Sequence, residues 1–157
     1  MDRPMRDSGH ETRDTGECGK LLPAAVLRYL SFPPTTRCCC MTDFRRLEAW
    51  QSSQKLAVVI YQLTTGFPAT ERFGLVSQMR RAAVSTMSNI AEGAGRGSDR
   101  EFLAFLRIAR GSLHEVESQC LLAQTLGFIS PAAADEALGL VGQTGRLLHG
   151  LIRALAP

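Results

Sequence analysis

Histidines, cysteines and carboxylates at characteristic spacings would carry any catalytic or metal chemistry in this sequence. A di-iron helical bundle needs a Glu-x-x-His pair on each of two helices, and no such pair occurs at His10, His114 or His149. The sequence also has no His-Glu-x-x-His motif and no Gly-x-Ser-x-Gly nucleophile elbow. We therefore expect no catalytic residue, no metal site and no cofactor, and we expect that the protein is not an enzyme.

The cysteine pattern supports neither a disulfide framework nor a zinc site. The five cysteines are Cys18, Cys38, Cys39, Cys40 and Cys120, an odd number with three adjacent residues and no Cys-x-x-Cys pair. Cys120 falls on the apolar face of a helical pattern. We expect it to be a small buried hydrophobic residue.

Arginines at helical spacing are the best candidates for binding nucleic acid. The predicted set is Arg96, Arg100, Arg107 and Arg110, and His114 continues the seven-residue spacing within it. Arginines in a row can follow a phosphate backbone, and each guanidinium can bind two phosphate oxygens. An ordinary charged outer face is the alternative, because Glu115 and Glu117 follow at once and the formal net charge is only +3.

One face of the segment around residue 85 carries short polar side chains where a solvated helix normally has long ones. The face consists of Gln78, Arg81, Ser85, Ser88, Asn89 and Glu92. Serine and asparagine are poor helix formers because they compete for backbone hydrogen bonds, but their small size lets another backbone come close. We predict that this face is an interface with another subunit. The alternative is a solvated face.

Apolar residues at a spacing of 3.6 predict four helices that would position these side chains. The predicted helices cover about residues 43–65, 70–92, 98–127 and 130–155. Glycine and proline separate them, and the string at residues 93–97 is expected to end the second helix. Because the connections are short, neighbouring helices should run antiparallel. The predicted fold class is all-α, an antiparallel up-and-down four-helix bundle over residues 42–157.

The expected caps and core positions are specific. Asp43 or Thr42 should cap the first helix, Ser98 and Glu101 should form a capping box, and Ser130-Pro131 should start the fourth helix. The first helix should turn Phe44, Leu47, Trp50, Ala57, Ile60 and Tyr61 to the core. The third should bury Phe102, Leu106, Ala109, Leu113, Val116, Cys120 and Ala123, and the fourth Ala134, Leu138, Val141, Gly145, Leu148, Ile152 and Leu155.

Residues 1–41 differ in composition from the rest of the chain. They mix charges with glycine, proline and cysteine and have no sustained helical or strand period, so we expect a disordered N-terminal extension. Met41 directly precedes a helix start, and our hypothesis is that it is the natural initiator. No apolar run is long enough to span a membrane and no secretory leader is evident, so we expect a cytoplasmic protein.

Three blocks of residues carry a resemblance to a known family. They are residues 67–68 with 74–85, residues 89–93 with 95–96, and residues 102–103, 105–106 and 108–112. Together they resemble the four helix bundle protein family, which includes the 23S rRNA intervening sequence proteins. The resemblance extends over about residues 44–155.

This resemblance implies a bundle that assembles as a homopentamer and has no established catalytic activity. The family is similar to the accessory variability protein of diversity-generating retroelements, a pentamer that binds a reverse transcriptase and nucleic acid. The matching blocks contain Arg80, Arg81, Asn89, Glu92 and Arg96, without assigning a role to any of them. Met87 stands where the family usually has a proline, so the residue expected to kink the second helix is missing.

The expected function is therefore a non-enzymatic homo-oligomeric scaffold associated with rRNA or with a nucleic-acid enzyme such as a reverse transcriptase. The alternative is direct binding of structured RNA through the arginine row. The expected partners are other copies of the chain, with RNA or a reverse transcriptase in addition, and no membrane.

Overall fold

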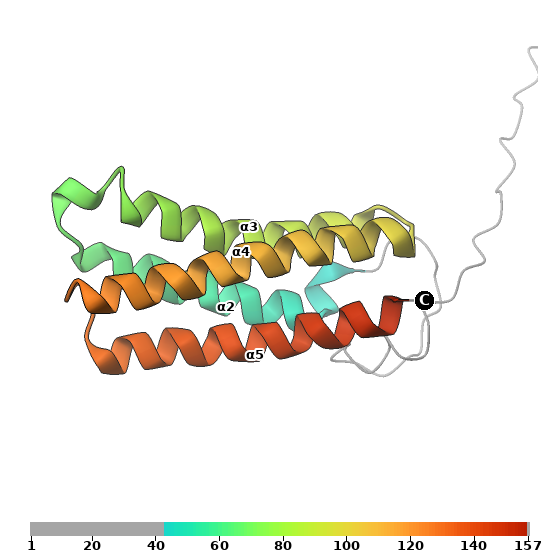
Figure 1. The fold of residues 1–157 in the computed structure, drawn as a ribbon. Helices are drawn as coiled ribbons and strands as arrows, with labels where there is room; N and C mark the ends of the chain where they lie inside the picture. Colours follow the sequence, from blue (N-terminus) through green and yellow to red (C-terminus); the bar gives the residue numbers. More distant parts are fainter. Residues whose placement is uncertain (1–42, 157) are drawn as a thin grey trace, which may run out of the picture.

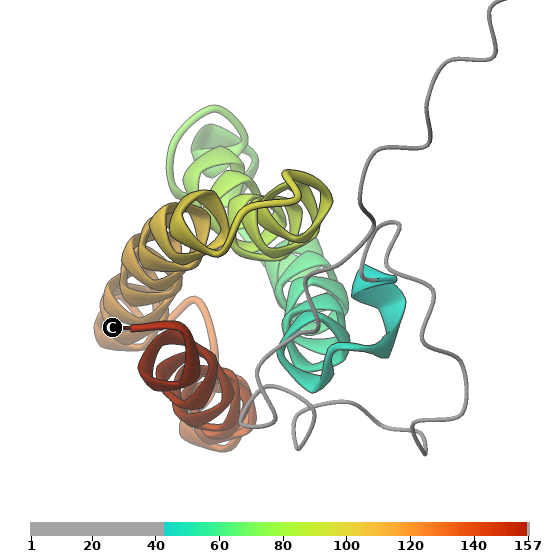
Figure 2. The ribbon, with the colours of Figure 1, turned by 90° about the vertical axis from the view of Figure 1, so that its right-hand side faces the viewer.

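The fold is known from a computed structural model, which describes residues 43–156. Within that range the chain forms four long helices and no strand. They are α2 (Glu48–Leu63), α3 (Leu75–Gly95), α4 (Asp99–Thr125) and α5 (Pro131–Leu155). The helices lie side by side (Figure 1) and surround a common interior when viewed from the end (Figure 2). This arrangement confirms the predicted all-α four-helix bundle; the predictions for residues 1–41 and for Met41 lie outside the described residues.

The first predicted helix, over residues 43–65, is divided in two. A short 3₁₀ helix, η1 (Phe44–Arg46), comes first, and the Asp43 side chain accepts a hydrogen bond from the Arg45 amide at 3.1 Å. Leu47 then takes an extended conformation, with φ −75° and ψ 119°, and α2 begins at the next residue. Because Leu47 is completely buried there, packing of this side chain compensates for the break that the apolar spacing did not predict.

The second helix starts later than the predicted residue 70. Two more 3₁₀ helices, η2 (Thr64–Gly66) and η3 (Ala69–Glu71), connect α2 to α3. The Glu71 carboxylate accepts a hydrogen bond from the Leu75 amide at 2.9 Å, so it satisfies a free donor at the start of α3. A glutamate four residues ahead of a helix start is not a standard capping residue, which explains the misplaced boundary.

The glycine string at residues 93–97 ends α3, as predicted, but the helix stops three residues later than the predicted end at residue 92. The helix continues through Gly93 and Gly95 and stops before Gly97, which has a positive φ of 71°. Gly93 is buried against α4. A β-carbon added to it would lie 2.6 Å from Phe105 Cβ and 2.9 Å from Phe102 Cδ2. This glycine therefore lets the two helices approach each other, whereas the turn is made four residues later.

The starts of α4 and α5 have the predicted serine caps, although the structure shows only the Ser98 half of the predicted capping box. Ser98 accepts a hydrogen bond from the Glu101 amide at 3.4 Å, and Ser130 accepts one from the Ala133 amide at 3.2 Å. Gly127 has a φ of 73° and separates the two helices. All seven predicted core residues of α4 are buried, as are Ala134, Val141, Leu148 and Ile152 of α5; Leu138, Gly145 and Leu155 are half-buried.

Two hydroxyl pairs join neighbouring helices across the bundle. Ser52 of α2 and Thr144 of α5 are buried and share a hydrogen bond of 2.8 Å, although they are 92 positions apart in the sequence. Ser85 of α3 and Ser112 of α4 share one of 2.9 Å. Each pair satisfies groups that would be costly to bury alone, so each pair fixes the register of the two helices that it joins.

Substitution of Gly93 by alanine should destabilise the bundle, because the new methyl group would collide with the base of the Phe105 side chain. We expect Gly93→Ala to lower the free energy of unfolding by about 1–3 kcal/mol, the usual cost of overpacking. The matched control is Gly95→Ala in the same helix, where nothing lies within 4 Å of an added β-carbon. It should leave stability unchanged or slightly higher. Urea unfolding followed by circular dichroism measures both, and equal effects would contradict this account of Gly93.

Removal of one hydroxyl from the Ser52–Thr144 pair should lower the free energy of unfolding more than removal of both hydroxyls. We expect Thr144→Val to lower the free energy of unfolding by about 1–3 kcal/mol, because the buried Ser52 hydroxyl loses its partner. Adding Ser52→Ala should restore part of that loss. Urea unfolding of the two single variants and the double variant gives the coupling energy. Strictly additive losses would show that the hydrogen bond contributes nothing.

Candidate interaction surfaces

The short polar residues predicted to face another subunit are placed in two different environments. Ser85 and Asn89 are half-buried. The Ser85 hydroxyl bonds to Ser112, and the Asn89 side-chain amide donates to the Ser85 carbonyl at 2.8 Å and to its hydroxyl at 3.1 Å. Ser85 thus bonds to α4 of its own chain, Asn89 bonds within α3, and the place of both residues at a subunit interface stays a prediction.

The other four residues of that predicted interface are exposed. They are Gln78, Arg81, Ser88 and Glu92. Arg81 donates a hydrogen bond to the Gln78 side chain at 2.8 Å, and Arg96 forms an ion pair with Glu92. This outer face of α3 is therefore accessible, and its role in binding another subunit stays a prediction.

The four predicted nucleic-acid-binding arginines also separate into two groups. Arg100, Arg107 and Arg110 are exposed on α4 and form no ion pair with any residue in the described range. Arg96 differs, because its guanidinium pairs with Glu92 and lies over the Phe105 ring, 5.1 Å from the ring centroid. The structure thus leaves three of the four guanidinium groups open to a phosphate, while the fourth is held where α3 joins α4.

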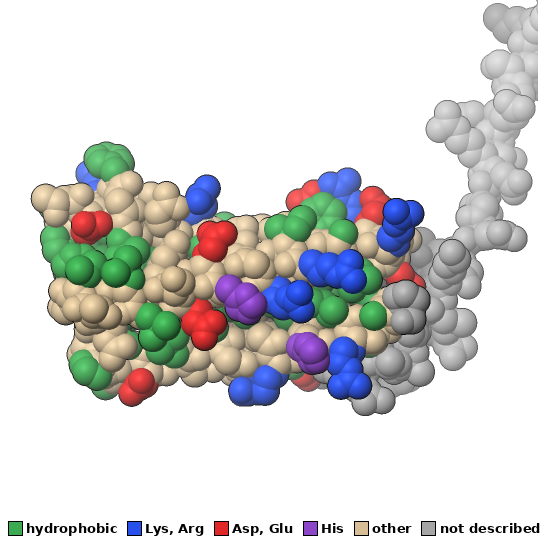
Figure 3. Space-filling view, viewed as in Figure 1, with side chains coloured by type: hydrophobic (Ala, Val, Ile, Leu, Met, Phe, Trp, Pro, Cys, Tyr) green, Lys and Arg blue, Asp and Glu red, His purple; other side chains and the backbone are tan. Residues whose placement is uncertain are grey.

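Helix α5 adds basic side chains that were not among the predicted nucleic-acid-binding residues. Arg146, His149 and Arg153 are exposed and follow one another at spacings of three and four, which places them on one side of α5. Lys, Arg and His side chains gather over α4 and α5, mostly in the half of the bundle where α4 begins and α5 ends (Figure 3). We call Arg100, Arg107, Arg110, Arg146 and Arg153 the basic face. The part of the basic face on α5 could have been predicted from the sequence, because Arg146, His149 and Arg153 have helical spacing.

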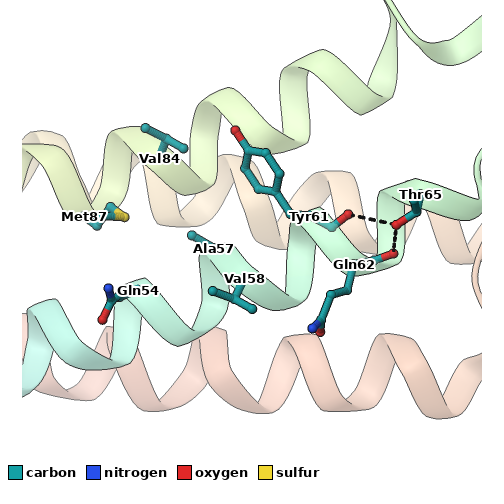
Figure 4. Close-up of a pocket in the computed structure, with 8 residues that line it drawn as sticks. All are labelled: Gln54, Ala57, Val58, Tyr61, Gln62, Thr65, Val84 and Met87. Carbon is teal, nitrogen blue, oxygen red and sulfur yellow. Dashed lines mark hydrogen bonds between the residues drawn. The ribbon is translucent and has the colours of Figure 1, made fainter.

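A shallow groove lies between α2 and α3 and has a volume of about 450 Å³. Its lining residues carry no charge and are Gln54, Ala57, Val58, Tyr61, Gln62, Thr65, Val84 and Met87. Figure 4 shows the first six along α2 and its C-terminal end, with Val84 and Met87 on α3 opposite them. Val58 is 52% exposed and Tyr61 45%, although Tyr61 was predicted to face the core. We call this surface the apolar groove.

Arg80 borders the apolar groove at the end of α2. Its Nε donates a hydrogen bond to the buried Thr64 hydroxyl at 2.8 Å, and its guanidinium lies 4.7 Å from the centroid of the Tyr61 ring. A guanidinium over an aromatic face is attracted by the ring quadrupole. The two contacts hold the Tyr61 ring in place, although nearly half of the side chain is exposed.

Comparison with known proteins identifies the family. The sequence profile of the 23S rRNA-intervening sequence protein family matches residues 45–150. The chain belongs to this family. A crystal structure from Bacteroides thetaiotaomicron VPI-5482, of a protein with unknown function from the S23 ribosomal protein family, matches with a TM-score of 0.61 and 22% identity. The match covers 67% of this chain and 98% of that one, and it supports the shared fold. No curated protein matches.

Met87 distinguishes this 23S rRNA-intervening sequence protein from the proline-containing pattern that it resembles. Helix α3 passes through Met87 without interruption. A proline there would remove a backbone donor and kink the helix. Met87 instead places a flexible thioether side chain in the lining of the apolar groove, where it can adapt to different contacts.

The remaining candidates for chemistry in this family member are few. Cys120 is buried, as predicted, and burial raises the pKa of its thiol to about 11, so it stays protonated and unreactive at neutral pH. Within residues 43–156, no three His, Cys, Asp or Glu side chains are grouped so that they could hold a metal ion. No helix in the same part of the chain is both long and apolar enough to span a membrane.

Proposed function

We propose that this 23S rRNA-intervening sequence protein is a non-enzymatic scaffold that assembles with copies of itself and acts in association with RNA. The apolar groove carries this proposal. Val58, Tyr61 and Val84 are each at least 39% exposed, and no charged residue lies among them. A continuous apolar surface of this kind marks a protein interface, because its burial removes hydrocarbon from water.

The homopentamer implied by the family resemblance is the assembly that we propose. A ring of five copies needs a head-to-tail contact, in which one surface of each molecule binds a different surface of the next. The exposed residues Gln78, Arg81, Ser88 and Glu92 of α3 lie on the same helix as the groove residue Val84, which supports their predicted place at such an interface.

The size of the full-length protein in solution tests the assembly. Light scattering after size-exclusion chromatography should give a mass well above the 17.1 kDa of one chain, and five times that mass for the pentamer. A series of concentrations shows whether the mass falls on dilution. A monomer at every concentration would refute the scaffold proposal. A smaller assembly would retain self-association and exclude only the pentamer.

Direct binding of structured RNA is a second candidate function, and the basic face favours it. Its five arginines extend over α4 and α5 and have no ion-pair partner among residues 43–156. Guanidinium groups that are not neutralised by nearby carboxylates are available for phosphate oxygens. The family description refers to 23S rRNA, which supports ribosomal RNA as the ligand. A reverse transcriptase is the alternative partner, suggested by the family resemblance alone.

Binding to structured rRNA fragments over a salt series tests this second function. Affinity should fall steeply with salt, and Arg110→Glu or Arg153→Glu should weaken binding and reduce the slope of log K against log salt by about one for each lost phosphate contact. The control is Arg46→Glu, which makes the same charge change in η1, where the chain packs against α2 and α3. Absence of salt-dependent binding by the unmodified protein would exclude direct RNA binding and leave the scaffold proposal intact.

A further inference from the structure

The outer side of α4 carries a second surface with little charge. Its residues are Ala104, Ile108, Gly111, Glu115, Ser118 and Leu122, which alternate spacings of four and three. All six are exposed, and Ile108 and Leu122 are 52% and 48% exposed. We call this surface the outer row. It contains a single charge, Glu115, where a helix side facing only water would carry several.

No close contact within the described part of the chain requires a glycine at position 111 in the outer row. It lies in the middle of a 27-residue helix, and nothing stands within 4 Å of a β-carbon added to it. Glycine inside a helix costs about 0.5–1 kcal/mol relative to alanine, because it loses more backbone entropy on folding. The closely packed Gly93 shows what such a residue accomplishes when another helix comes near. A surface that came equally close to Gly111 would have to belong to another molecule, because nothing in the described fold lies there.

The outer row is longer than the apolar groove, so it can fill the whole groove, and the two surfaces are similar in character. The groove follows α2 from Gln54 to Thr65, about 17 Å at the helical rise of 1.5 Å per residue. Ile108 and Leu122 are about 21 Å apart on the same scale. A channel between two helices accepts the ridge of a third, and small residues allow that third helix to lie deep.

Charge supports the same pairing. Glu115 is the one charged member of the outer row, and it has no ion-pair partner within residues 43–156. Arg80 borders the apolar groove beside Tyr61, and Arg81 follows it on α3. A helix seated in the groove by its outer row would therefore place a carboxylate near guanidinium groups.

The two surfaces cannot meet within one molecule. Helix α2 packs mainly against α3 and α5, and α4 packs against the same two helices, so α2 and α4 occupy opposite corners of the bundle (Figure 2). We infer that the outer row of one copy binds in the apolar groove of the next, an inference that rests on the proposed self-association. Each molecule then presents one groove and one row, and the contact is head-to-tail.

Two exposed substitutions in the full-length protein test the pairing. Val58→Glu places a charge in the groove, and Leu122→Glu places one in the outer row. We expect each variant alone to be monomeric, because each retains only one working surface. The control is Gln143→Glu, an equivalent change at an exposed position of α5, which should assemble as the unmodified protein does. Circular dichroism checks that all three variants keep their helical content.

Mixing the two disabled variants is the decisive measurement. Val58→Glu retains its outer row and Leu122→Glu retains its groove, so an equimolar mixture should form a 1:1 complex that grows no further. Sedimentation velocity would detect this heterodimer. Failure of the mixture to associate, or normal assembly of either variant alone, would overturn the inference while the scaffold proposal stands. A monomeric unmodified protein would overturn both.

Gly111→Leu gives an independent test in the same helix. It should leave a single copy folded, because nothing lies within 4 Å of a β-carbon added at this exposed position. It should weaken assembly at least tenfold, because a bulky side chain would then separate the two helices. Assembly as tight as that of the unmodified protein would contradict the close contact at this position.

Discussion

Gly93 sits where any side chain would collide with α4, and the close contact that it permits determines how α3 and α4 lie against each other. Several features described above depend on that contact. The Ser85–Ser112 hydroxyl pair forms across it, and the Arg96 guanidinium reaches the Phe105 ring at the same junction. Val84 and Met87 come from the same helix and line the apolar groove with α2. The absence of a β-carbon at Gly93 thus affects both the packing of α3 on α4 and the position of the α3 residues that line the apolar groove.

The placement of the two candidate surfaces follows from the geometry of a four-helix bundle. Each helix has one inward side, and neighbouring helices share an outer side between them. The groove between α2 and α3 has an uncharged lining, whereas the side shared by α4 and α5 is rich in arginine. The groove contact of an oligomer and an RNA ligand would therefore lie on different sides of the bundle. The outer row and the α4 arginines lie on neighbouring stripes of one helix, so the two interactions are close enough to influence each other.

Much of the fold could be predicted from the sequence, because it depends on local patterns. The caps at Ser98 and Ser130 and the buried positions of α4 follow from the chemistry of a few neighbouring residues. The errors arose where distant packing decided the outcome. Leu47 leaves the helix because it is buried, and α3 continues through Gly93 because α4 lies against it. Tyr61 has the spacing of a core residue, but its ring lies beneath Arg80 at the surface.

The buried hydrogen bond between Ser52 and Thr144 limits the order in which the helices can pack during synthesis of the chain. Its partners come from the first and last long helices, 92 positions apart in the chain. The other interhelical hydroxyl pair joins consecutive helices. During synthesis α3 and α4 can come together before α5 has been made, but Ser52 of α2 has no partner until α5 emerges from the ribosome. The four-helix bundle therefore closes only after α5 has been made.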